Sequence, residues 1–174
     1  METIDREQLL RLLSASRKKL LESTEGLTEE QAKMRPAEDR WTVFECVEHV
    51  GLVEDVMFSA VTTKMVPEEP PADRSREQEI IRRATNRSRK IEAPETVTPG
   101  GKFATLKEAL EHFERSRART IEYVESCDSD LRAVAATHPV LGKATGQEFM
   151  LILALHPARH ALQILELREA LGLD

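Results

Sequence analysis

The clearest structural signal in the 174-residue chain lies near its end, at 145-TGQEFMLILALHPARHALQILELREALG-172. Thr145 and Glu148 have the spacing of a capping box, so a helix is expected to begin there. Gly172 is placed to end this helix. The stretch predicts a long helix whose apolar stripe carries two histidines at its centre. The residues on that stripe are Phe149, Ile152, Leu153, His156, His160, Gln163 and Leu167.

Three other segments have the same helical spacing of apolar residues. The first covers residues 4–21, the second begins with a capping box at Thr42 and Glu45, and the third begins with one at Thr105 and Glu108. Alternating residues that would indicate a strand occur only near Val97 and over 134–140. Four core helices of similar length predict a single all-α domain over 1–174, built as a four-helix bundle.

A long connection separates the second and third of these core helices. Its residues 73–92 carry many charges and few apolar groups, and a surface helix over 75–89 is only weakly indicated. Prolines and the Gly100-Gly101 pair indicate an irregular path for the rest. Connections of this length often cover a functional site.

Composition excludes several classes of protein. The net charge of −6 gives no basic field for nucleic acid. No apolar stretch is long enough to span a bilayer. The opening METIDREQLL lacks the basic-then-apolar order of a signal peptide, so we expect a cytoplasmic protein. Two isolated cysteines form no disulfide framework, and Cys46 is expected to pack in the core.

His156 and His160 are the strongest candidates for chemistry. Residues four apart lie on one face of a helix, so both rings can point at a single metal ion. His49, at the margin of the second helix's stripe, can supply a third ligand. Three histidines leave room for water or substrate, as in catalytic metal sites. The alternative is that each histidine makes an ordinary buried hydrogen bond.

Pro157 follows His156 directly and lies inside the predicted helix. A proline there removes a hydrogen bond to the carbonyl four residues earlier, here that of Leu153, so we expect a kink and an unbonded carbonyl near the histidines.

Other polar and aromatic residues are less informative. Trp41 is interpreted as a core anchor at the start of the second helix, with a wall of the pocket as the alternative. His112, among charged neighbours, and His138, in a loop, are expected to lie outside the site. Glu48 adjoins His49 but points away from the apolar stripe, so no general base is identified.

These features resemble the DinB-like (YfiT-like) superfamily over nearly the whole chain. The matching features are Trp41-Thr42 opening a helix, His49 seven residues after Thr42, and His156-Pro-Ala-Arg-His160 followed by Gln163. The resemblance implies an up-up-down-down four-helix bundle, often a homodimer. It also implies a divalent metal, commonly zinc or nickel, held by His49, His156 and His160.

Characterised relatives of that superfamily include thiol S-transferases and metal-dependent hydrolases. We therefore expect a metal-dependent enzyme that acts on a small-molecule substrate, either as a thiol S-transferase using a low-molecular-weight thiol or as a hydrolase. The alternative is a non-catalytic metal-binding or dimeric stress-response bundle, which a site distorted by Pro157 would favour.

Overall fold

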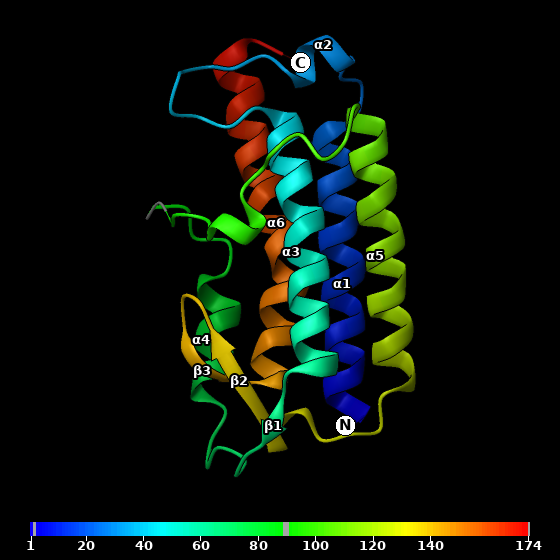
Figure 1. Ribbon diagram of the computed structural model, residues 1–174, viewed down its shortest axis with the longest axis vertical. Coiled ribbons are helices and arrows are strands. Elements are labelled where there is room, and N and C mark those ends of the chain that lie inside the picture. The colour runs from blue at the N-terminus through cyan, green and yellow to red at the C-terminus, as the bar shows by residue number, and fades with distance from the viewer. Residues whose placement is uncertain (2, 89–90, 174) are drawn as a thin grey trace.

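Four long helices form the bundle in the computed structural model, which describes residues 1, 3–88 and 91–173 (Figure 1). They are α1 (Thr3–Thr24), α3 (Val43–Thr63), α5 (Leu106–Ser126) and α6 (Gly146–Leu171). α6 packs against both α1 and α3, and α5 packs against the same two helices. The predicted four-helix bundle is confirmed, and α3 and α6, which carry the histidines, are neighbours.

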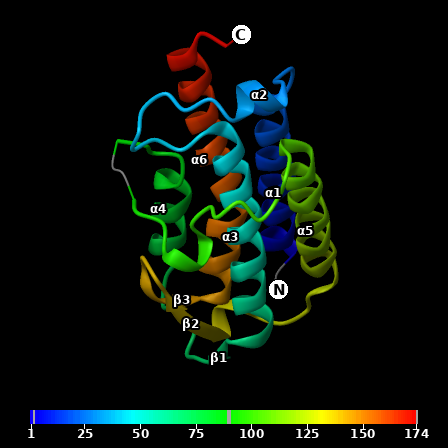
Figure 2. The ribbon, with the colours of Figure 1, turned by 45° about the horizontal axis from the view of Figure 1, so that its top comes forward.

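Two of the four helices run in each direction, as predicted. Along the chain the helices run up, down, down and up, whereas the resemblance implied up, up, down and down (Figures 1 and 2). The short link after α1, which contains α2 (Glu29–Ala32), turns the chain back into α3. The long connection then returns to the same end of the bundle, so α5 runs parallel to α3.

Local capping sets the helix boundaries. Thr42 accepts the Glu45 N–H at 3.1 Å, and Glu45 accepts the Thr42 N–H at 2.7 Å. The same reciprocal pair joins Thr145 and Glu148 at the start of α6. Each such cap contributes about 1 kcal/mol to helix stability. Gly172 ends α6 with a left-handed φ of 65°.

The third predicted capping box is only half formed. Thr105 accepts the Glu108 N–H, but the Glu108 carboxylate accepts from Ala104, one residue before the cap. The free N–H groups of Leu106 and Lys107 at the start of α5 instead donate to the carboxylate of Glu29, which lies outside the helix.

The long connection contains a two-residue strand, a short helix and a turn. They are β1 (Val66–Pro67), α4 (Ser75–Arg83) and the 3-10 turn η1 (Glu95–Val97). α4 confirms the weakly indicated surface helix but ends earlier than predicted, and it packs against α6. The segment near Val97 forms a turn rather than the strand that its apolar residues suggested.

A small antiparallel sheet closes one end of the bundle. Its order is β1-β2-β3, with β2 at Val134–His138 after the 3-10 turn η2 (Leu131–Ala133), and β3 at Gly142–Thr145. Ala135 pairs with Val66 on one side and with Thr145 on the other. β3 leads directly into the cap of α6, so the sheet fixes where that helix begins.

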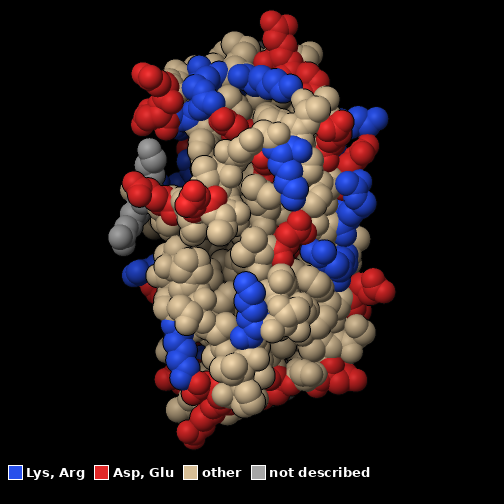
Figure 3. Space-filling model, in the orientation of Figure 1, with Lys and Arg blue, Asp and Glu red and all other residues tan. Residues whose placement is uncertain are grey.

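The face of the molecule shown in Figure 3 carries no large patch of a single charge. Basic and acidic side chains are interspersed on the face shown in Figure 3, in keeping with a modest net charge of −6. Within the described part of the chain, no helix is both long enough and apolar enough to cross a membrane.

Candidate metal centre

Three histidines from two neighbouring helices converge between α3 and α6. One ring nitrogen of each of His49, His156 and His160 lies within 4.8 Å of the other two. The Nε2 atoms of His156 and His160 are 3.0 Å apart. The structure thus brings together the three histidines singled out in the sequence, while their role as metal ligands stays a prediction.

His49 is buried, with 5% of its surface exposed. Its position at the margin of the apolar stripe of α3 suggested a more exposed side chain. Its Nδ1 lies 2.7 Å from the carbonyl oxygen of Val97 in η1. A carbonyl only accepts hydrogen bonds, so Nδ1 carries the proton and Nε2 keeps its lone pair. A backbone carbonyl bonded to the far nitrogen is the usual support of a metal-binding histidine.

The pair on α6 lies at the edge of the buried stripe rather than at its centre. His160 is buried, whereas His156 is half-buried. The predicted central position is wrong because the bundle buries a different line of α6: Met150, Leu153, Ala154, Pro157, Ala161, Ile164 and Leu167. The histidines therefore face α3 and the long connection.

The remaining nitrogen of His160 is poorly satisfied. Nδ1 is buried and has no hydrogen-bond partner of normal geometry among the described residues, although Gln163 is close enough to favour the charged form of the ring. The Gln163 Oε1 atom instead accepts from Arg87 at 3.1 Å. The two rings share one short contact, and a metal ion bound to their nitrogens would give both rings a suitable partner.

The surroundings of the three imidazoles favour their neutral form. Burial is the main cause that lowers the pKa of each ring below its ordinary value. At His156 and His160 the neighbouring histidines and Arg159 lower the pKa further. The neutral imidazole is the form that binds metal, so the residues present fit a divalent ion.

Trp41 forms one wall of the cluster. Its ring centroid is 4.8 Å from that of His49 and 6.4 Å from that of His160, against which it stacks. Trp41 is half-buried and also packs against the core cluster that contains Val43 and Val47. Both interpretations of this residue hold, because the same side chain packs against the core cluster and lies against two of the clustered histidines.

Sequence reasoning missed the part that Glu48 plays beside the centre. This side chain points away from the apolar stripe, as predicted, but it is completely buried by the connection. Its carboxylate accepts the N–H groups of Gly100, Gly101 and Lys102 at 2.8–3.2 Å. The Gly100-Gly101 pair was the available signal, because a tight turn of free N–H groups binds a carboxylate well.

The other two histidines lie outside the cluster, as expected. His112 is half-buried: its Nε2 lies 2.8 Å from Asp55 and its ring covers Gly51, where a Cβ would lie 3.0 Å from the ring. The Nδ1 atom of His138 accepts N–H groups from Val140 and Leu141 and closes the β2–β3 turn. Both have structural partners.

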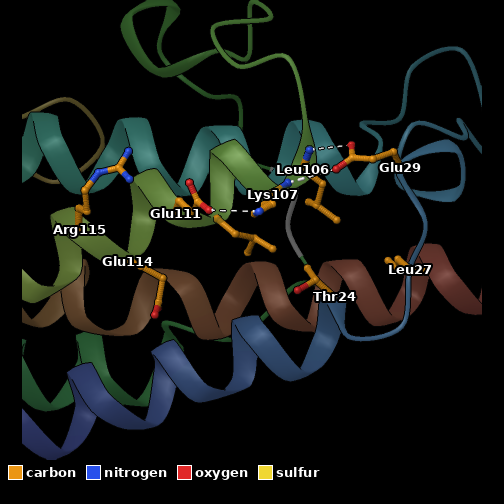
Figure 4. Close-up of a pocket in the computed structure, with 9 residues that line it drawn as sticks. Thr24, Leu27, Glu29, Leu106, Lys107, Glu111, Glu114 and Arg115 are labelled. Carbon is orange, nitrogen blue, oxygen red and sulfur yellow. Dashed lines mark hydrogen bonds and ion pairs between the residues drawn. The ribbon is translucent and has the colours of Figure 1, made fainter.

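A groove of about 550 Å³ lies elsewhere, between the end of α1 and the start of α5 (Figure 4). Within it, Glu29 already accepts the N–H groups of Leu106 and Lys107, so the helix start offers no open anion site. The groove contains none of the three clustered histidines. Its lining is Thr24, Leu27, Glu29, Leu106, Lys107, Leu110, Glu111, Glu114 and Arg115.

A four-helix bundle with three histidines between two core helices defines the class of this protein. Its sequence matches the model of the DinB superfamily over residues 12–164, so the chain belongs to that superfamily.

Known proteins resemble this chain at low sequence identity, one by sequence and two by structure. The uncharacterized protein YuaE of Bacillus subtilis is 21% identical over 144 residues, covering 83% of this chain and 87% of YuaE. YfiT from Bacillus subtilis, described as a probable metal-dependent hydrolase with an unusual four-helix bundle topology, superposes with a TM-score of 0.64 at 17% identity, covering 100% of this chain and 91% of YfiT. The four-helix bundle protein TT2238 gives 0.57 at 22% identity, covering 92% and 98%.

Proposed function

We propose that this protein is a divalent-metal-dependent enzyme that hydrolyses a small molecule, with His49, His156 and His160 as the metal ligands. The convergence of three neutral imidazole nitrogens within 4.8 Å carries the proposal. The description of YfiT as a probable metal-dependent hydrolase agrees with it.

The ligand set favours a catalytic site over a structural one. Among the residues that the structure describes, the cluster contains no carboxylate or thiol as a fourth ligand. Three ligands leave positions for water and substrate. A bound divalent ion lowers the pKa of a water or thiol and so supplies a nucleophile near neutral pH. Zinc and nickel are the ions that we propose, because both accept imidazole nitrogen.

The surrounding residues would orient the ligands and limit access. The Val97 carbonyl holds the His49 ring, and Trp41 covers His49 and His160 on one side. The half-buried His156 marks the side from which a substrate could arrive. The site thus combines an aromatic wall with polar groups, since Arg159 is close enough to lower the pKa of His156 and His160.

Metal content and hydrolysis, measured together, test this function. Protein purified without chelator should hold zinc or nickel by mass spectrometry and should hydrolyse members of an ester and amide panel. His160→Ala should lose both the metal and the activity. His112→Ala, a histidine outside the cluster, should keep both. Metal-free wild-type protein that neither zinc nor nickel restores would contradict the proposal.

A thiol S-transferase is the second candidate. Three neutral ligands leave the full charge on a dication, which favours an anionic ligand such as a thiolate. The test is metal-dependent consumption of a low-molecular-weight thiol with a chloroaromatic electrophile. Faster thiol transfer than ester hydrolysis would select this reaction. A metal-loaded protein with neither activity would favour a binding bundle.

We also propose a homodimer. Leu162 and Leu165 lie on the outer face of α6 with 42% and 51% of their surfaces exposed, next to each other at helical spacing. Light scattering of the wild type and of Leu165→Asp tests this: a dimer that dissociates in the variant supports it, and a monomeric wild type rejects it.

A further inference from the structure

Two neighbouring residues of α3 hold the two ends of one segment of the connection. This segment, residues 97–102, is called the strap. His49 donates from Nδ1 to the carbonyl of Val97 at one end, and Glu48 accepts three successive N–H groups at the other. Figure 1 shows the chain passing from η1 along α3 toward the start of α5.

The geometry of the strap depends on the carboxylate. Three N–H groups that point at one site carry a concentrated positive dipole, and they need an acceptor when covered. Gly101 has a φ of 75°, a conformation that residues with a side chain rarely adopt. Glu48 is fully buried, and among the described residues its carboxylate is the side-chain acceptor that these three groups share.

We propose that Glu48 is a positioning residue for the metal centre. By holding the strap it keeps the Val97 carbonyl against Nδ1 of His49, and this bond presents the unprotonated Nε2 to His156 and His160. This inference rests on the proposed function, since a positioning role matters only if the histidines bind metal. Losing support of this kind commonly weakens metal binding 10–100-fold.

Glu29 offers a matched control. It also accepts two backbone N–H groups from the chain just beyond the strap, those of Leu106 and Lys107, but it lies in the groove remote from the histidines. Glu29→Gln and Glu48→Gln make the same chemical change. Each replaces one acceptor oxygen with an NH₂ group that cannot accept from the backbone.

The experiment reads the tautomer of His49 in metal-free protein by long-range ¹H–¹⁵N NMR, and then zinc affinity by chelator competition. We expect wild type and Glu29→Gln to show His49 protonated on Nδ1 alone. Glu48→Gln should show a mixture of tautomers and bind zinc about tenfold more weakly, at the lower end of the effect of lost ligand support.

A second pair of variants keeps the test available if Glu48→Gln does not fold. Gly101→Ala strains the strap at its left-handed residue, whereas Gly100→Ala meets open space without that constraint. Both positions are exposed, so neither change disturbs the core. Gly101→Ala should reproduce the mixed tautomer and the weaker zinc binding, and Gly100→Ala should not.

Unchanged tautomer and zinc affinity in both Glu48→Gln and Gly101→Ala, relative to their controls, overturn the proposal. A mixed tautomer in these two variants supports the positioning of His49 even if wild type binds no zinc or nickel. In that case the proposed metal function fails while the role of Glu48 in orienting the ring stands.

Discussion

Arg117 donates from Nη2 to the carbonyl oxygen of Leu153 at 3.2 Å, and this is the carbonyl that Pro157 leaves without its helical partner. The unbonded carbonyl expected from the sequence is therefore satisfied from α5. α6 continues through Pro157 to Leu171 as one helix. A bend of its axis at the proline stays a prediction.

The same guanidinium joins all four core helices. It pairs with Glu54 of α3 at 2.7 Å and donates to the Leu13 carbonyl of α1 at 3.2 Å. Thr120 donates to the other oxygen of Glu54 at 2.8 Å. Burial lowers the pKa of Arg117 and raises that of Glu54, so each depends on the other to stay charged.

Arg117→Met should therefore be strongly destabilising. It leaves Glu54 buried without a counter-charge, which typically costs about 3–5 kcal/mol of unfolding free energy. Urea denaturation followed by circular dichroism measures the loss. Arg119→Met is the matched control, because Arg119 pairs with Asp55 at a half-exposed site and such pairs contribute about 1 kcal/mol or less. Equal losses in the two variants would contradict the account.

Pro157→Ala should stabilise the protein. Alanine restores an N–H for the Leu153 carbonyl and removes a residue that costs about 3 kcal/mol inside a helix. Because Arg117 already satisfies that carbonyl, we expect a smaller gain, of about 1–2 kcal/mol. The measurement is the urea midpoint at constant slope. A loss of stability would show that α6 requires the proline.

Acid should destabilise the metal-free protein through the three clustered histidines. Their pKa values are lowered in the folded state, mainly by burial, from an ordinary value of 6.5. The unfolded chain therefore binds protons below about pH 6.5 that the folded chain refuses. The neutral histidines therefore cost no folding stability above that pH, and the folded state loses stability as the pH falls below it.

Comparison with a double variant isolates this effect. Wild type and His156→Gln/His160→Gln share the same carboxylates and His49, so the difference between their stability curves reports His156 and His160. Wild type should lose more stability between about pH 7 and pH 5. Parallel curves would show that the rings titrate normally and that their burial has little effect.

Zinc should raise the melting temperature, and chelator should reverse the rise. A ligand at 100 times its dissociation constant stabilises the folded state by about 2.7 kcal/mol. His160→Ala should show no zinc-dependent shift, whereas His112→Ala should keep the wild-type shift. A shift that survives in His160→Ala would place the zinc outside the cluster.

Local sequence signals predicted the elements well. The Thr42–Glu45 and Thr145–Glu148 pairs act within one helical turn, so they marked the starts of α3 and α6. The convergence of His156 and His160 is likewise local, because it follows from their spacing of four residues. The half-formed box at Thr105 shows the limit, since Glu29 satisfies that helix start from a distant part of the chain.

The parts that sequence could not predict depend on how the long connection docks. Val97 is 48 residues from His49, and Glu48 is 52 residues from Gly100, so no periodicity joins them. The position of the histidine pair at the edge of the buried stripe also follows from the helix order, because the neighbours of α6 decide which of its faces is covered.

The most direct test of the metal centre is a crystal grown with zinc or nickel and measured at that metal's absorption edge. We expect an anomalous peak between His49, His156 and His160, about 2.0–2.1 Å from one nitrogen of each ring. The His49 nitrogen at the peak should be Nε2, with Nδ1 still on the Val97 carbonyl. Metal-soaked crystals with no peak among the three rings would contradict it.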